Sequence, residues 1–516
     1  MGRANIVRIV LAGAVGFCGL GASIAPLYAQ KTDRITVALA EDIRGLDPRR
    51  ERDGMSDEAH IHVVEGLVGY SDTLEVVPVL AKSVETSDDG RVYTFTLRDG
   101  VKFHNGAPLT SEEVKWSWSY LNAEDSIWRC KAVFEGPIKV DSVEAPDAAT
   151  VVFTLAEPSG SFLYNLARTD CAQTPVLHPD SVAEDGSWRN VIGTGPFTLG
   201  ERRIGEYVDI HRFADYQPSD EPASGLVGKK EALVDHVRFS VVSDQAARTV
   251  GLRSGDIDVA LITAESVQQI EADPKLRVAT APTTVWYSLL LGMSDPLLED
   301  VRIRQAIAAA IDINAVAQGV SFGQWSGSST PVSPSSSLYE EPAEAPYSIE
   351  KAKVLLTEAG YAGQPIKIMA NKAYSQMFDQ AVIIQAMLQQ VGINATIETL
   401  EWGLQLEHYS KGTYQAQSFG YSGRFDPMGA WERIVGPEPR KVWQDPEAIE
   451  LLNAGMKATD AAEMKDISNQ LYAKFVEEVP AVSLYHVQVA YGVSDRLQGF
   501  EASPLEAIRL WNVSVK

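Results

Sequence analysis

Residues 93–114 read YTFTLRDGVKFHNGAPLTSEEV, and this stretch combines strand, turn and helix signals. Its β-branched and aromatic residues predict a strand over 92–97, and a turn that ends in Gly100 leads to a second short strand over 101–103. The Thr-Ser-Glu-Glu sequence that follows places a capping residue and acids in the first turn of a helix, predicted over 110–121. Paired strands followed by a capped helix indicate an α/β fold.

The remainder of the chain continues this mixture of strands and helices. A strand over 237–242, a helix over 245–253 and a turn into a short strand over 255–260 form a βαβ unit, which implies parallel strands. Further strands are predicted over 34–39, 149–155, 285–292, 366–369, 395–400, 481–485 and 489–491, and further helices over 56–67, 301–317, 351–359 and 376–391. With no tandem repeat, this content predicts an α/β architecture of more than one lobe.

The N-terminus has the order of segments that marks a secretory signal peptide. Arg3 and Arg8 give a positive head, residues 6–26 are rich in apolar and small residues, and Ala29 precedes an abruptly polar stretch. We predict cleavage after Ala29, so that 1–29 are removed and the mature protein is periplasmic. A membrane anchor is the alternative, and a lipid-anchored Cys18 is disfavoured by the bulky residue before it.

Length and charge restrict the class of protein. Removal of 29 of the 516 residues leaves 487, which exceeds the roughly 250–300 residues at which a single core stops growing. Two or three domains follow. The formal charge of −24 becomes −26 without Arg3 and Arg8, and so acidic a chain argues against nucleic acid or anionic membranes as partners.

Two cysteines remain after the signal peptide, Cys130 and Cys171. In an oxidising compartment such a pair often forms a disulfide. The bond would close a loop of about 40 residues, which the chain-entropy model values at roughly 3–4 kcal/mol. Two unpaired buried thiols are the alternative.

Four stretches together carry a resemblance to a known family. They are 80–114, which includes the opening block, 193–197 (GTGPF), 296–312 with VRIRQAI at its centre, and 348–361. They resemble the signature of the family 5 extracellular solute-binding proteins, the peptide-, nickel- and opine-binding receptors of bacterial ABC importers. The resemblance extends from about Arg34 to the C-terminus.

The resemblance implies a two-lobed periplasmic binding protein of type II, class C, with an additional subdomain inserted in lobe one. The implied segments are 30–72, 192–281 and 488–516 for lobe one, 73–191 for the inserted subdomain, and 282–487 for lobe two. This division places Cys130 and Cys171 in the same subdomain. It also implies an ABC permease and an ATPase subunit in the inner membrane as partners.

Patterns of known catalytic chemistry are missing from the sequence. It has no Walker loop, no HExxH, no GxSxG elbow and no paired CxxC motif. His60 and His62 have the spacing of a metal pair on a strand, but the surrounding pattern is helical and predicts surface or capping histidines. We therefore predict that the chain is not an enzyme, that it binds neither metal nor cofactor, and that another subunit hydrolyses ATP.

The most informative candidate for ligand contact is the loop 417–427, QSFGYSGRFDP. An aromatic residue, a small flexible turn and charges form a loop whose backbone can approach a ligand closely. By the resemblance, peptide-binding members often carry here an acid that binds the ligand's α-amino group, whereas this chain has Arg424 at that place and Asp426 two residues later.

Arg424 predicts an anionic group on the ligand, because a guanidinium favours carboxylate or phosphate. One alternative gives Asp426 the role of binding an amine. The other is an ion pair of Arg424 with Asp426 or another acid that only braces the loop. Tyr421, Ser422 and Gly423 complete the predicted contact set of this loop.

Two residues outside this loop are further candidates. Trp402 follows the strand predicted over 395–400 and either walls a ligand pocket or belongs to the core. Arg44 lies in the loop after the first strand, and ligands of open α/β sheets favour the carboxyl ends of strands. Tyr485, His486 and Trp325 are weaker candidates.

These observations predict capture of a di- or oligopeptide-like solute between two lobes of a monomer, and its delivery to the permease. The ligand shifts the protein toward the closed form only by as much as it prefers that form. Receptors for an opine, a sugar conjugate or a nickel chelate are the alternatives within this class. A secreted hydrolase and a periplasmic chaperone or signalling receptor are alternatives from other classes.

Overall fold

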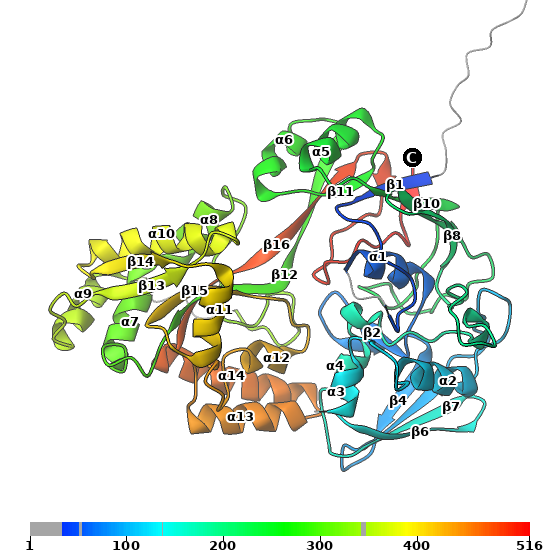
Figure 1. The fold of residues 1–516 in the computed structure, drawn as a ribbon, viewed down its shortest axis with the longest axis horizontal. Coiled ribbons are helices and arrows are strands. Elements are labelled where there is room, and N and C mark those ends of the chain that lie inside the picture. Colours follow the sequence, from blue (N-terminus) through cyan, green and yellow to red (C-terminus); the bar gives the residue numbers. More distant parts are fainter. Residues whose placement is uncertain (1–33, 51–53, 137, 342–346) are drawn as a thin grey trace, which may run out of the picture. The chain divides into compact units, whose positions relative to one another are not determined.

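The computed structural model describes residues 34–516 except 51–53, 137 and 342–346 (Figure 1). The signal peptide predicted for 1–29 lies outside the described residues. Among the helices of this described part, none combines the length and the apolar character that crossing a membrane requires.

A ten-stranded sheet is the largest element of this part. Its strands are β1 (Arg34–Leu39), β8 (Phe197–Arg203), β9 (Tyr207–Arg212), β10 (His236–Val241), β11 (Val259–Leu261), β12 (Leu276–Leu291), β13 (Ile366–Ala370), β14 (Ala395–Thr399), β15 (Ala416–Tyr421) and β16 (Ala481–Ser494). They lie in the order β14-β13-β15-β12-β16-β11-β1-β10-β9-β8. The predicted βαβ unit is confirmed, because β1 pairs in parallel with both β10 and β11, and α5 (Gln245–Ser254) lies between those two in the chain.

The long strands β12 and β16 connect the two halves of this sheet (Figure 1). They pair antiparallel along 276–282 and again along 286–290 of β12, with a register shift between Pro282 and Trp286. On one side of the shift β16 also pairs with β11, and on the other side β12 also pairs with β15. Thus β12 and β16 join the two halves of the sheet, and their pairing is interrupted between Pro282 and Trp286 of β12. The strands predicted at 285–292, 481–485 and 489–491 are parts of these longer strands.

A second sheet has four antiparallel strands and contains the strand predicted over 92–97. Its strands lie in the order β4 (Ala81–Thr86), β5 (Val92–Leu97), β7 (Thr150–Leu155) and β6 (Val140–Asp147). The helix predicted after it is confirmed as α2 (Ser111–Leu121). Thr110 caps this helix by accepting from the backbone N–H of Glu112, and the Glu113 carboxylate accepts from the backbone N–H of Thr110 at 2.9 Å.

The short strand predicted over 101–103 is not formed. Residues 101–109 instead fold back on themselves, with the N–H of Phe103 donating to Ala107 O and the N–H of Leu109 donating to Val101 O. The Asn-Gly turn comes so soon after 103 that the segment pairs with its own continuation, so no ladder to the four-stranded sheet forms.

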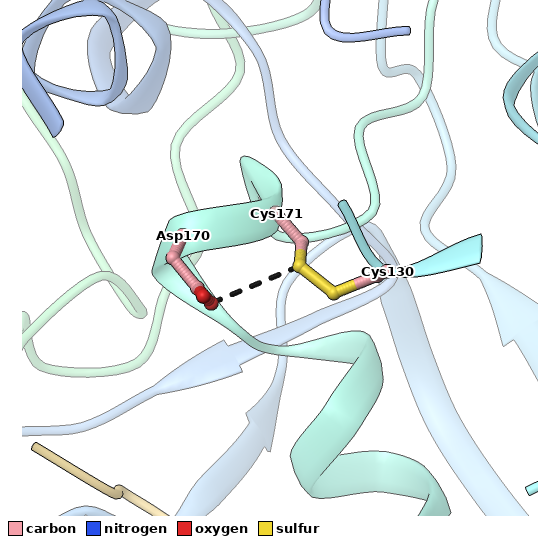
Figure 2. A group of neighbouring side chains, drawn as sticks. All are labelled: Cys130, Asp170 and Cys171. Carbon is pink, nitrogen blue, oxygen red and sulfur yellow. Dashed lines mark hydrogen bonds between the residues drawn. A yellow bond between two sulfur atoms is a disulfide. The ribbon is translucent and has the colours of Figure 1, made fainter. Parts of the chain in front are cut away.

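A disulfide joins Cys130 and Cys171, whose Cα atoms lie 6.0 Å apart (Figure 2). It connects the start of α3 (Lys131–Glu135) to the short 3₁₀ helix η1 (Thr169–Cys171). Asp170 Oδ1 lies 3.7 Å from the Cys171 sulfur, a contact only, because a disulfide sulfur carries no hydrogen. Since both sulfurs are used in the bond, this group of three residues offers no thiolate to a metal ion.

The structure corrects the expectation for His60 and His62. Both lie on α1 (Gly54–Val63), which ends before the predicted residue 67, and both side chains are buried. His62 Nδ1 lies 2.8 Å from Glu58 O, and His62 Nε2 accepts from the backbone N–H of Leu510. The predicted surface position is wrong because a segment more than 400 residues later in the chain covers this helix.

The part of the chain between β12 and β16 is rich in helices. The single helix predicted over 301–317 is two helices, because Ile311 is extended and Asp312 caps the second by accepting from the N–H of Ala315. The helices are α7 (Val301–Ala310), α8 (Ile313–Val320), α9 (Ile349–Glu358), α10 (Ser375–Gln390), α11 (Trp402–Lys411), α12 (Pro427–Glu432), α13 (Pro446–Lys457) and α14 (Ala461–Glu478).

Short elements complete the described fold. They are β2 (Val68–Tyr70), β3 (Val76–Pro78), α4 (Phe162–Leu166), η2 (Pro179–Ser181), η3 (Ala264–Ser266), α6 (Val267–Glu271), β17 (Leu497–Gln498) and β18 (Ser514–Val515).

Candidate functional site

The predicted ligand loop begins where β15 ends. Tyr421, the last residue of β15, is buried and stacks on Trp286 of β12, with ring centroids 5.3 Å apart. Trp286 is the first residue of β12 to pair with β16 after the register shift. Gly423 also lies close to the interrupted part of β12, because a Cβ on Gly423 would be 2.7 Å from Thr284 Oγ1. The loop is therefore anchored where the two connecting strands are interrupted.

Arg424 is exposed and bonds only within its own loop. Its Nη1 donates to Ser422 Oγ at 3.0 Å and to Gly423 O at 2.8 Å. These acceptors are neutral, and within the described chain Arg424 forms no ion pair with any acid. Arg424 therefore pairs neither with Asp426 nor with another acid among the described residues. Within the part of the chain that the structure describes, the positive charge of Arg424 has no ion-pair partner.

Asp426 faces protein groups. Its Oδ1 accepts from the backbone N–H of Met428 at 2.9 Å and caps α12, while its Oδ2 accepts the Ser161 hydroxyl at 2.7 Å. Burial raises the pKa of Asp426, and the hydrogen bonds from Ser161 and the helix backbone oppose this only in part. Its role as partner of a ligand amine stays a prediction, but both oxygens already have donors from the protein.

Trp402 and Arg44 lie apart from the loop. Trp402 is the first residue of α11 and is partly buried between Tyr374 and Phe419, whose ring centroids lie 5.0 and 5.8 Å away. Arg44 is exposed after β1, and its carbonyl oxygen accepts from Arg202 Nη2 at 3.0 Å. The structure brings Trp402 near β15 through Phe419, but no described contact joins Arg44 to the loop.

Arg433 is a cation at this site that the sequence analysis did not select. It caps the C-terminal end of α12 and is only 4% exposed. Its Nη2 donates to Thr284 O at 3.0 Å, whereas Nε and Nη1 are buried without an acceptor among the described residues. Burial, together with the charge of Arg424, lowers the pKa of Arg433 to about 9, so the side chain is charged at neutral pH. The sequence around it, Trp-Glu-Arg, carries no signal of this burial.

Glu506 brings an acid from the C-terminal segment to the same loop. Its Oε1 lies 3.6 Å from the position that a Cβ of Gly423 would take. The side chain is exposed, yet the protein around it is dense enough to raise its pKa by desolvation. Its backbone has a φ of 59°, and its carbonyl oxygen accepts from the hydroxyl of Tyr491 at 3.2 Å. A strained backbone held by such bonds is common at ligand sites.

A cavity of about 250 Å³ lies elsewhere in the part between β12 and β16. Its lining includes Thr330, Tyr339, Trp431, Asn469 and Tyr472. The predicted site residues and Arg433 do not line it. The candidate site is therefore the loop 417–427 with the charges around it, and not this cavity.

A family model described as bacterial extracellular solute-binding proteins, family 5 middle, matches residues 75–440. The chain belongs to this family. Its members are substrate carriers of ABC importers and not enzymes, and they are periplasmic or extracellular. The predicted family, the α/β binding-protein fold class and the carrier function are thereby confirmed.

Relatives in sequence and in structure cover most of the chain. The glutathione-binding protein GsiB of Salmonella typhi is 27% identical over 390 residues, which cover 75% of this chain and 73% of that protein. Di/tripeptide-binding protein 1 of Pseudomonas aeruginosa (strain UCBPP-PA14) is 25% identical over 505 residues, with 91% and 92% covered. The structure of HbpA2 from Haemophilus parasuis is similar with a TM-score of 0.83, 24% identity, and 94% and 100% covered.

Proposed function

We propose that this family 5 binding protein captures a di- or oligopeptide-like solute between two lobes and delivers it, as a monomer, to an ABC permease and its ATPase. Relatives named for glutathione and for di- and tripeptides support this ligand class. The proposed lobes are 30–72, 192–281 and 488–516 against 282–487, with 73–191 as the inserted subdomain.

The observation that carries the proposal is the interruption of β12 and β16. Their register shifts between Pro282 and Trp286, at the proposed boundary between the lobes. Three residues of β12, 283–285, lie opposite one residue of β16, Val487, and such an interruption can absorb the φ/ψ changes of a hinge. Because the ligand loop is anchored to Trp286 and Thr284, a bend at this level would move the loop relative to the C-terminal segment that carries Glu506.

Within this proposal the loop supplies the contacts of lobe two. Tyr421, Ser422, Gly423 and Arg424 form its tip, with Trp402 as a wall and Arg44 as a contact from lobe one. Ligand binding would then favour the form in which both lobes contact it.

The test is thermal melting of the mature protein with a library of di- and tripeptides that includes glutathione. A peptide at 100 times its Kd should stabilise the folded state by about 2.7 kcal/mol and raise Tm, because it binds the folded state only. Small-angle scattering should show compaction with the same peptide, and mass spectrometry should recover the peptide unchanged. Stabilisation by an opine, a nickel chelate or a sugar conjugate, with no effect of any peptide, would refute the proposed ligand class. Cleavage of a peptide would refute the carrier mechanism.

A further inference from the structure

The guanidinium of Arg433 lacks most of the partners that a buried cation needs. Arginine has five N–H donors, and burying a charge is unfavourable unless it is paired and hydrogen-bonded. Arg433 is 4% exposed, and its one hydrogen bond goes to Thr284 O, a neutral acceptor. Two of its three nitrogens have no acceptor within the described structure.

The acids nearby are engaged elsewhere. Glu432, the neighbour of Arg433 in the chain, lies within ion-pair distance of Lys441 and Arg440. Asp426 accepts from Ser161 and from the backbone of α12. Glu506 approaches Gly423, but among the described ion pairs it has none with either arginine.

A second cation, Arg424, adds to the positive charge around Arg433. The charge of Arg424 acts on Arg433 and disfavours its charged form. Both arginines belong to the segment 424–433, in a chain whose net charge is −24. Glu432 opposes this effect, but its carboxylate also lies within ion-pair distance of Lys441 and Arg440. Two cations that form no ion pair among the described residues favour an anion at this place.

We infer that the solute carries a carboxylate or a similar oxyanion, and that Arg433 is the residue that selects it, with the exposed Arg424 as a second contact. The inference rests on the proposed function and specifies its ligand class. Arginine suits this task because its planar fork of donors matches a carboxylate and it stays charged when buried. The oxygens of the solute would accept hydrogen bonds from Nε and Nη1 of Arg433, which have no acceptor among the described residues.

The test compares peptide acids with their amides. The probes are one library of di- and tripeptides and the same library with amidated C-termini, and the proteins are wild type, Arg433→Met and Arg424→Met. Wild type should bind the best free acid at least about 30-fold more tightly than its amide, the loss typical of removing one partner of a buried charge pair. Arg433→Met should bind acid and amide about equally, whereas Arg424→Met should keep most of the preference because the exposed arginine contributes less.

Equal binding of acids and amides by wild type, or an unchanged preference in Arg433→Met, would overturn the inference. The stability of the ligand-free variant is a second readout that needs no known ligand. Arg433→Met should unfold at the same or a higher urea concentration than wild type, and a lower midpoint would show that Arg433 braces the fold and would also overturn the inference.

The cargo that co-purifies with the protein separates this inference from the peptide proposal. Native mass spectrometry of wild type should show a cargo that bears a carboxylate or a similar oxyanion and that is lost from Arg433→Met. Such a cargo that is not a peptide would refute the peptide proposal and support the inference. A cargo without any oxyanion, or an oxyanion-bearing cargo retained by Arg433→Met, would overturn the inference even if the cargo is a peptide.

Discussion

Arg304 on α7 and Arg433 at the end of α12 are equally buried, each 4% exposed, yet their surroundings differ. Arg304 uses all three nitrogens. Nε and Nη2 donate to Glu478 O, and Nη1 donates to Leu298 O at 2.7 Å. Arg433 uses one nitrogen, for one carbonyl.

The difference shows that burial alone does not reveal what an arginine does. Neither side chain forms an ion pair with an acid among the described residues. Arg304 nevertheless has its donors satisfied, and in return it satisfies carbonyl groups at the C-terminal end of α14, which helical hydrogen bonds leave free. The Arg433 side chain forms one hydrogen bond, to Thr284 O, and two of its three nitrogens have no acceptor among the described residues. We interpret Arg304 as a residue that stabilises the fold, and Arg433 as a residue whose free donors bind a ligand.

The largest effect is expected from Arg304→Met. The substitution keeps the length of the side chain but leaves several buried carbonyl groups without a donor, each worth about 1–3 kcal/mol. We expect the free energy of unfolding to fall by about 3 kcal/mol or more, measured by urea denaturation of cargo-free protein. A loss below about 1 kcal/mol would mean that solvent or a rearranged neighbour replaces Arg304, and the comparison would fail.

A smaller effect of opposite sign is expected from Arg433→Met in the same assay. Replacing an unpaired buried charge by an apolar side chain of similar size removes a desolvation penalty, so the free energy of unfolding should stay unchanged or rise by about 1–2 kcal/mol. Arg304→Met is the matched control, since residue type, burial and substitution are the same. Similar losses in both variants would erase the distinction between the two arginines.

The smallest net effect is expected from two buried groups on α1, because their titrations change the stability in opposite directions. Burial lowers the pKa of His62 to about 4 and raises the pKa of Glu58, on the same helix, to about 8. Between pH 6.5 and 4 the unfolded chain gains a proton at His62 that the folded chain does not, so the stability due to His62 is lost as pH falls. Between pH 4.5 and 8 the folded chain keeps a proton on Glu58 that the unfolded chain loses, so the stability due to Glu58 is lost as pH rises.

Two variants separate these opposing contributions. His62→Gln should leave a stability that declines more steeply from pH 4.5 to 6.5, and Glu58→Gln should leave one that rises more steeply over the same interval. Urea midpoints at pH 4.5, 5.5 and 6.5 measure both slopes. Identical slopes in the two variants would show that His62 and Glu58 are not held neutral by burial.

The sequence predicted the class of this protein and many of its elements. The strand over 92–97 and the helix after Thr110 were predictable because β-branched alternation and a capping box act over a few residues. Asp312 shows the limit of this approach, since a cap inside an apolar run split one predicted helix into two. For the site, the sequence pointed to the loop at 417–427 and to the charge of Arg424.

The tertiary structure alone decided which charged and polar groups are buried and which of them find partners. Thr284, the one hydrogen-bond partner of the Arg433 side chain among the described residues, is 149 residues away in the chain, and Leu510, which bonds His62, is 448 residues away. Local patterns report the conformation of the backbone, because that depends on neighbours in sequence. The desolvation of a side chain depends on whichever segments the fold packs around it, so the buried, unsatisfied Arg433 became visible only when those segments were assembled.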